Sequence, residues 1–239
     1  QRVTSIVFDV ELIYLARRNP ALSRREFVVR WRRHGALGMS LPRWRNVARY
    51  VHCDALVPSV PTPAIDPGPD AIGIVWHRSP AARAAHLADT GSRLQMEQDE
   101  LETFARPIVE TCLLAREHVL LAPPGATAMT LAGVNVVKLT RFLQARDDAP
   151  SPGAAFTWEF VDQRHLELAA AGAPVRGHML DLPLPPERGT AWGLDCAAVE
   201  ELWFDGLAAA EAAARLLVTD SIAPAATAVL TNEVLLYST

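Results

Sequence analysis

The first half of the chain shows strand-like and helix-like patterns of apolar residues in turn. Residues 5 to 15 place apolar and polar side chains on opposite sides with a period of two, which is typical of a half-buried strand. Ser23 and Glu26 have the spacing of a capping box and predict a helix over residues 24 to 34. Further predictions are strands over 47–57, 71–77 and 113–122, and a helical region from Pro80 with breaks near Gly91 and before Pro107. The predicted order is βαββαβ.

The second half repeats this order after a proline- and glycine-rich segment. The sequence Ile-Val-Trp-His at residues 74 to 77 matches Glu-Leu-Trp-Phe at residues 201 to 204, and an alanine-rich helix is predicted after each. The predicted elements are strands over 134–142, 175–182, 197–204 and 232–237, and helices over 154–170 and 207–217. We therefore predict an internal duplication, with a first module over residues 1–122, a linker over 123–130 and a second module over 131–239.

A duplicated βαββαβ unit has a simple way to bury its surfaces. One unit forms an antiparallel sheet with both helices on one face and leaves the other face uncovered. Two units in one chain can bury their uncovered faces against each other. The predicted fold class is therefore α+β: tandem ferredoxin-like modules whose sheets pack face to face as a barrel with the helices outside and a ligand-sized interior. Such a pseudo-dimer can still associate further.

Two segments resemble the EthD-like family of the dimeric α+β barrel superfamily. Residues 22 to 27, followed by Trp31 and His34, are similar to that family's first helix, and residues 199 to 205 are similar to its third strand. Together with residues 49–51 and 117–119, the resemblance extends over nearly the whole chain in two copies. It implies the barrel fold and a small-molecule function, because related barrels include cofactor-free monooxygenases, polyketide cyclases, isomerases and dehalogenases.

The resemblance is weaker in the second half. Trp31 and His34 are one residue closer together than the family pattern has them, and the second half retains only Phe156, Phe160 and His165. The halves have therefore diverged, and the resemblance does not fix the reaction, because one fold supports many functions.

Composition narrows the choice of partners. A net charge of −4 without a basic excess argues against nucleic acid. The three cysteines are scattered, without a CxxC pair or a nearby histidine, so we expect neither a disulfide framework nor a local metal site. No apolar run approaches a membrane span and residues 1 to 10 lack a signal-peptide pattern, so we expect a cytoplasmic protein without a membrane partner. The abundance of alanine and arginine is typical of a GC-rich bacterial genome.

The first and second strands supply polar candidates for the barrel interior. No phosphate-binding loop, GxSxG elbow, HExxH motif or Rossmann fingerprint is present. Asp9 and Glu11 share one side of the first strand, where burial would raise their pKa values toward those of a general base, although they could also meet solvent at a barrel mouth. Tyr50, His52 and Asp54 share one side of the second strand, and a histidine near a carboxylate suits proton transfer near neutral pH.

Five further residues are candidates for the site. His178 occupies a place in the second half that roughly corresponds to His52. Glu201 interrupts an apolar strand and so needs a partner or a role. Trp76 and Trp203 could form the wall of an aromatic ligand site, although tryptophan in a strand is more often core. His34 either has a role in the site or caps the end of its helix.

The sequence thus predicts a cofactor-independent enzyme that uses general acid–base catalysis on a small apolar, aromatic or polyketide-like substrate, as a cyclase, isomerase, lyase or dehydratase. The alternatives are a cofactor-free monooxygenase of a phenolic substrate and a non-catalytic accessory protein that binds a hydrophobic ligand. Haem would need an axial ligand inside the barrel. The predicted catalytic residues are His52, His178, Glu11, Glu201 and His34; the predicted substrate-binding residues are Trp76, Trp203, Tyr50, Asp9 and Asp54; no metal or other cofactor is predicted.

Overall fold

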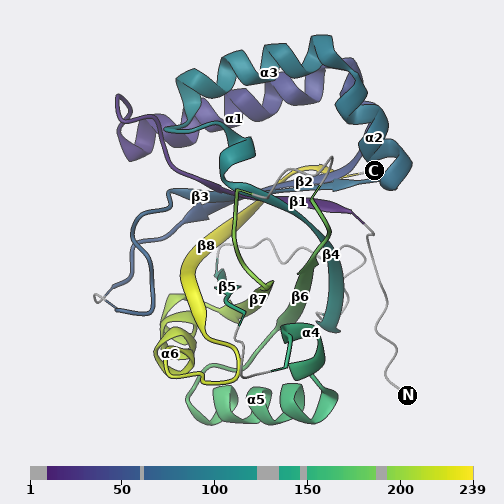
Figure 1. Ribbon diagram of the computed structural model, residues 1–239. Coiled ribbons are helices and arrows are strands. Elements are labelled where there is room, and N and C mark those ends of the chain that lie inside the picture. Colours follow the sequence, from purple (N-terminus) through teal and green to yellow (C-terminus); the bar gives the residue numbers. More distant parts are fainter. Residues whose placement is uncertain (1–9, 60–61, 123–134, 146–149, 187–192, 239) are drawn as a thin grey trace.

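Strands from both halves of the chain close into one antiparallel barrel, with helices on its outside (Figure 1). The computed structural model describes residues 10–59, 62–122, 135–145, 150–186 and 193–238. The strands are β1 (Glu11–Ala16), β2 (Val47–Ala55), β3 (Ala71–His77), β4 (Cys112–Leu121), β5 (Val136–Leu143), β6 (Gly177–Pro183), β7 (Ala198–Asp205) and β8 (Ala225–Ser238). The helices are α1 (Arg24–Ser40), η1 (Pro42–Asn46), α2 (Pro80–Ala88), α3 (Thr90–Thr103), η2 (Ile108–Glu110), α4 (Pro152–Ala155), α5 (Trp158–Ala170) and α6 (Leu207–Leu217).

The strand order is equivalent in the two halves. Around the barrel the first half runs β4-β1-β3-β2 and the second runs β8-β5-β7-β6. The last strand of each half joins the two sheets: β4 pairs with β1 over residues 112–115 and with β6 over 115–121. In the same way, β8 pairs with β5 over residues 225–231 and with β2 over 231–238. These two shared strands leave no free sheet edge among the described strands.

Helices cover the outer faces at opposite ends of the molecule in Figure 1. Over the first half, Phe27 and Trp31 of α1 pack on Tyr14 of β1, and α3 lies beside α1. Over the second half, α5 and α6 lie at the other end, and the alanines of α6 pack on β5 and β7. None of the described helices combines the length and apolar character that crossing a membrane requires.

Helix α1 confirms its predicted start and corrects its predicted end. Ser23 accepts a hydrogen bond from the Glu26 backbone, and the Glu26 side chain accepts one from Ser23, so the capping box is present. The helix continues to Ser40, and Gly35 and Gly38 let its last turns lie close to the layer beneath it. A Cβ atom at Gly35 would lie 3.2 Å from the Tyr50 ring, and one at Gly38 would lie 3.2 Å from the Trp44 ring.

The last strand is longer than its sequence pattern predicts. β8 begins at Ala225 instead of residue 232, because its alanine-rich first part is held by the ladder with β5 and not by strong strand propensity. The predicted helical region after Pro80 is two helices that meet at Asp89. Residues 5 to 9 of the first predicted strand lie outside the described residues.

Candidate functional site

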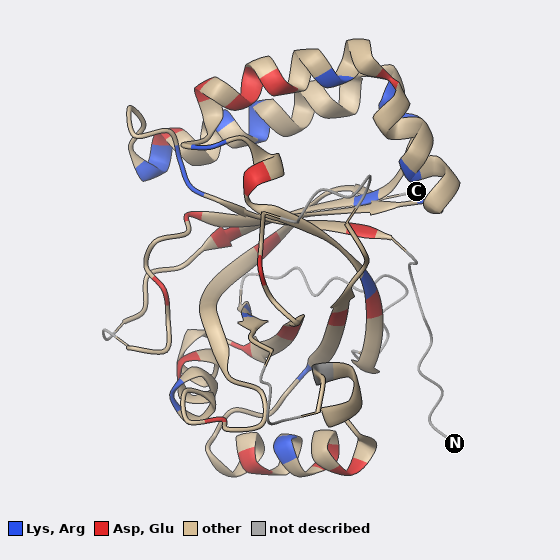
Figure 2. Cartoon of the chain, in the orientation of Figure 1, with Lys and Arg blue, Asp and Glu red and all other residues tan. Residues whose placement is uncertain are grey.

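The barrel interior has an apolar layer and a charged layer. Residues that face each other across a ladder point to the same side, and the pairs Ile13–Ile74 and Ile74–Val51 belong to the apolar layer. The apolar layer contains Ile13, Val51, Cys53, Ile72, Ile74, Leu113, Ala115, Phe142, Val199 and Val229. The charged layer lies next to it, further along the same strands. We include in it Glu11, Arg49, Trp76, Glu117, Lys138, Asp181, Glu201, Trp203 and Glu233, all of them buried. Figure 2 shows acidic positions on the barrel strands as well as on the helices.

Lys138 is held between two carboxylates. Its Nζ atom lies 2.7 Å from Oε1 of Glu201 and 2.7 Å from Oε1 of Glu233. The indole nitrogen of Trp203 donates to Glu233 at 3.0 Å, and Nζ lies 5.2 Å from the centre of the Trp203 ring. Burial opposes the charge of Lys138, but the neighbouring acidic groups outweigh it and hold its pKa well above the usual range. Lys138 is therefore a fixed cation and not a nucleophile.

Glu201 is the predicted catalytic residue that faces this cation. Burial raises its pKa above the usual range, and Lys138 acts in the opposite direction. A carboxylate in that position combines a raised proton affinity with an adjacent positive charge. The partner that the sequence analysis required for Glu201 is thus Lys138, which is the single lysine of the chain.

Three further carboxylates lie close together in the charged layer. Glu11 of β1, Glu117 of β4 and Asp181 of β6 each offer an oxygen, and these three oxygens lie within 4.8 Å of one another. Burial raises the pKa values of Glu11 and Asp181 well above their usual range and that of Glu117 to about 7. The Trp76 indole donates to Oε2 of Glu117 at 3.3 Å. Shared protons or a bound cation could offset the repulsion among these carboxylates.

Arg49 is a buried cation that the sequence analysis did not single out. Its guanidinium carbon lies 4.5 Å from the centre of the Trp76 ring, and Glu11, Trp76 and Arg49 occupy one row across β1, β3 and β2. None of its three side-chain nitrogens has a hydrogen-bond acceptor among the described residues. An arginine within a predicted strand was the available signal, since a strand buried on both sides must accommodate it.

Tyr50, His52 and Asp54 do share one side of β2, but it is the side beneath α1. The His52 ring stacks on Trp31 with 3.5 Å between ring centres, and its Nε2 atom lies 2.6 Å from the Tyr50 hydroxyl. Arg32 of α1 forms an ion pair with Asp54 and contacts Nδ1 of His52 at 2.6 Å. The expectation that these residues face the barrel is wrong, because the outer face of the sheet is as deeply buried as the inner one.

His178 occupies the equivalent outer position in the second half. Its Nδ1 atom lies 2.9 Å from Nε2 of His165, and its Nε2 atom lies 3.1 Å from Oε1 of Glu200. Glu200 also pairs with Arg141 and Arg164, so His178 belongs to an ion-pair network between the sheet and α5. The expectation that His178 faces the barrel is therefore also wrong.

His34 lies within α1 and does not cap its end. Its Nδ1 atom lies 2.7 Å from Oδ2 of Asp99 on α3, and the side chain is buried. The contact links α1 to α3 and explains why a helix-facing histidine occurs at this place. The capping interpretation is wrong because the helix continues to Ser40.

The remaining predicted residues that the structure describes all face the barrel interior. The structure places Trp76, Trp203, Glu11 and Glu201 inside the barrel, whereas Asp9 lies outside the described residues. All seven histidines are described, and none of them faces the barrel interior. The chain therefore offers no histidine as an axial ligand to a haem inside the barrel.

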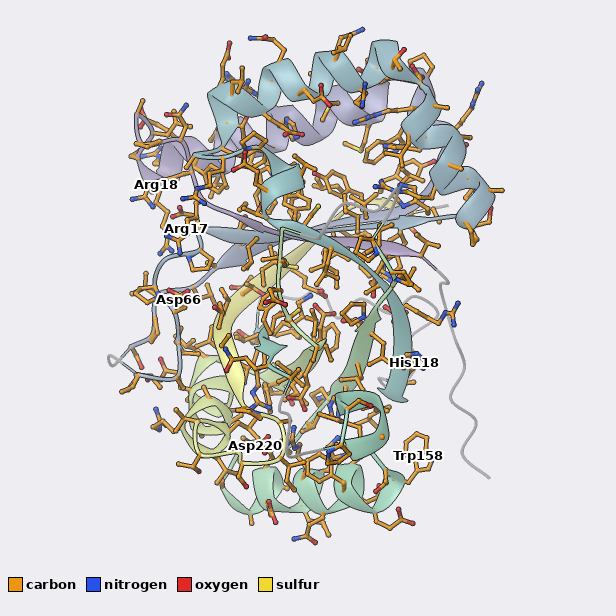
Figure 3. The ribbon with its side chains drawn as sticks, in the orientation of Figure 1. Arg17, Arg18, Asp66, His118, Trp158 and Asp220 are labelled. Atoms are coloured by element: carbon orange, nitrogen blue, oxygen red, sulfur yellow. The ribbon has the colours of Figure 1, made fainter. Side chains whose placement is uncertain are left out.

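Cavities lie at the apolar end of the barrel. One of about 440 Å³ is lined by barrel-facing Ala55 and Val229 and by the proline-rich β2–β3 loop, including Pro58, Pro63 and Ile65. A neighbouring cavity of about 340 Å³ is lined by Leu15, Leu194 and Thr227 among others. Asp66 lines both, and Figure 3 shows it on the same side of the molecule as Arg17 and Arg18. Small-molecule sites commonly have volumes of roughly 300–1,000 Å³.

Comparisons with known proteins identify the fold. No protein-family model and no curated protein matches the chain. An anthrone oxidase-like protein of known structure is 11% identical, with 98% of this chain and 94% of the other covered and a TM-score of 0.53. A chlorite dismutase-like protein is 10% identical, with 95% of each chain covered and a TM-score of 0.52.

This chain shares its fold with these two proteins, and that fold is a closed antiparallel barrel of eight strands with helices on its outside. The predicted α+β barrel is thereby confirmed as a fold, whereas the EthD-like family stays a prediction. At about one residue in ten identical, the likeness concerns the path of the chain and does not extend to the reaction.

Proposed function

We propose that this chain is a cofactor-independent enzyme that uses general acid–base catalysis on a small apolar, aromatic or polyketide-like substrate. The observation that supports this proposal most directly is the buried pair of Glu201 and Lys138 inside the barrel. A carboxylate of raised proton affinity can accept a substrate proton, and an adjacent ammonium can stabilise the anion that forms. Cyclisation, isomerisation and elimination all require these two elements.

The apolar end of the barrel suits the proposed class of substrate. The cavity of about 440 Å³ is lined mainly by aliphatic and proline side chains, so it favours a hydrophobic body over a charged one. Trp203 adjoins the ion pair, and its indole nitrogen donates a hydrogen bond that holds Glu233 beside Lys138. His52 and His178, which face the helices, have no place in this version of the mechanism.

The test is turnover of a panel of phenolic and polyketide-like ketones by the wild type and by Glu201→Gln. We expect the variant to lose about 100-fold or more in kcat, the usual contribution of a positioned proton-transfer group. Lys138 keeps Glu233 as a partner, so Glu201→Gln should retain the circular dichroism spectrum of the wild type. Glu159→Gln, an exposed change on α5, is the matched control and should have full activity.

Equal turnover by Glu201→Gln and the wild type would remove the proposed role of Glu201. Saturable binding of panel compounds without turnover would instead favour a non-catalytic accessory protein that holds a hydrophobic ligand. In either case the binding curves show whether the apolar end of the barrel is the ligand site, because Val229→Trp would fill that cavity and weaken binding.

A cofactor-free oxygenase is the second candidate. The fixed charge of Lys138 would stabilise a phenolate, which is the form of a phenol that reacts with O2, and a structural neighbour is described as anthrone oxidase-like. Oxygen consumption during turnover distinguishes this candidate from the first, since cyclisation, isomerisation and elimination consume none.

We also propose that the two halves are copies of one ferredoxin-like module of the EthD-like kind, joined near residues 123–130. The equivalent strand orders and the equivalent exchange of β4 and β8 support a duplication. The EthD-like assignment rests on the sequence resemblance around Trp31 and His34. A test is expression of residues 131–239 alone, which should assemble as a symmetric dimer if the module can replace its partner.

A further inference from the structure

Three carboxylates from separate strands meet at one point in the charged layer. The oxygens of Glu11, Glu117 and Asp181 lie within 4.8 Å of one another, so a point exists within about 2.8 Å of all three. Oxygen ligands bind Ca²⁺ at about 2.3–2.6 Å and Mg²⁺ at about 2.0–2.1 Å. Small side-chain rotations would therefore bring all three oxygens to coordination distance.

Asp181 provides a separate sign that something is bound there. Only 1% of its surface is exposed, and no nitrogen or hydroxyl of the described residues donates a hydrogen bond to either carboxylate oxygen; its carboxyl neighbour is Glu11 of the same cluster. It faces Glu117 directly across the β4–β6 ladder. A buried carboxylate without donors is costly, and buried acceptors in native proteins nearly always have partners. One oxygen each of Glu11 and Glu117 is likewise without a donor.

The charges of the surrounding layer compensate these three carboxylates only in part. The described residues of the layer include five carboxylates and two cations, a difference of three negative charges when all are ionised. Lys138 is taken up by Glu201 and Glu233. Arg49 lies over the Trp76 ring, and its nitrogens do not reach a carboxylate within hydrogen-bond distance. A divalent cation at the centre of the three would supply two of the three positive charges that the layer lacks.

We propose that Glu11, Glu117 and Asp181 bind a divalent cation inside the barrel. A site made only of carboxylate oxygens suits Mg²⁺, Mn²⁺ or Ca²⁺ better than cations that prefer sulfur or nitrogen. Three protein ligands leave coordination positions for water or for an oxygen of a bound compound. The site joins β1 and β4 of the first half to β6 of the second, so the cation would fasten the two halves together. This inference goes beyond the proposed function, because binding needs no substrate.

The test uses the full chain treated with a chelator and then titrated with MnCl2. We expect one Mn²⁺ per chain, counted from the loss of the free Mn²⁺ signal in electron paramagnetic resonance, and a rise of several degrees in Tm at saturation. Asp181→Asn and Glu117→Gln should each weaken binding at least 10-fold and abolish the rise in Tm. Ca²⁺ and Mg²⁺ should displace Mn²⁺.

Glu159→Gln is the control, since it removes an exposed carboxylate of the same kind and should bind as the wild type does. Failure of the wild type to bind Mn²⁺ at millimolar concentration would overturn the proposal. Unchanged binding by Asp181→Asn would also overturn it, because the ion would then occupy a surface site. Since the wild-type stoichiometry is decisive by itself, the test holds even if one variant folds poorly, and it is independent of the turnover experiments on Glu201.

Discussion

This protein has two groups of buried charged side chains, and they differ in how completely their charges are paired. Beneath α5 and α6, Glu200 pairs with Arg141 and Arg164, and Asp220 pairs with the same two arginines. Arg141 also donates to the carbonyl oxygens of residues 217 and 223. Burial alone would raise the pKa of Glu200, but Arg164 and Arg141 outweigh it and hold that pKa well below the usual range. Each charge in this network has a partner.

In the barrel, Glu11, Glu117 and Asp181 have one another as neighbours, and burial raises the pKa of each. Buried charges that are fully paired have a structural role, whereas buried charges that lack partners indicate a functional one. A complete network joins a helix to a sheet and needs nothing else, whereas an incomplete one requires a proton, an ion or a ligand. The incomplete group lies inside the barrel, in its charged layer.

The largest expected effect comes from breaking the complete network. Glu200→Gln leaves two buried arginines with only Asp220 between them, so we expect a loss of about 3–5 kcal/mol in the free energy of unfolding. Urea denaturation at pH 7 measures this loss. Because the folded pKa of Glu200 is depressed, its stabilisation is present above the unfolded pKa near 4.5 and is lost as the pH falls toward the folded value. A loss below about 1 kcal/mol would show that the network contributes little.

A smaller effect is expected at His77, which has no hydrogen-bond partner on either ring nitrogen among the described residues. Burial, followed by Arg83, lowers its pKa to about 2, so it avoids the cost of an unpaired charge by staying neutral. The unfolded chain takes up a proton below its pKa of about 6.5, so stability falls as the pH drops below that value. His77→Phe should remove about 2 kcal/mol of the stability difference between pH 7 and pH 5. Identical pH profiles for variant and wild type would contradict this assignment.

The smallest expected effect has the opposite sign. In chelator-treated protein, Asp181→Asn removes an unpartnered buried charge and should raise the free energy of unfolding at pH 8 by about 1–2 kcal/mol. Urea denaturation of both proteins side by side measures it. If Asp181→Asn instead lost as much stability as Glu200→Gln, the distinction between the complete and the incomplete group would fail.

Much of the fold could be predicted from the sequence. The strand over Ala71–His77 and the helix over Leu207–Leu217 have the predicted bounds, because each combines a clear period with clear stops. The pattern failed where propensity was weak, as in the alanine-rich start of β8, and where a glycine looked like a helix end, as at Gly35. Only the ladder with β5 and the close approach of α1 to the sheet decide those two places.

For the candidate site, the sequence predicted which residues share a face of a strand but not what that face contacts. Alternation correctly grouped Tyr50, His52 and Asp54 on one side of β2, and correctly grouped Glu201 with Trp203. It could not say which side was the interior, because helices bury the outer face of the sheet as completely as the barrel buries the inner one. Lys138 and Arg49 were visible as charges in apolar strands, but their partners are distant in sequence.

The order of the strands and the sharing of faces within each strand could be predicted from the sequence alone, because both follow from local periodicity. The tertiary structure alone decided which face is inside, and which carboxylates meet there. Glu11, Glu117 and Asp181 come from three strands that are separated by up to 170 positions between Glu11 and Asp181, and only closure of the barrel brings their oxygens together. Closure is a property of two sheets packed against each other, and no single strand encodes it.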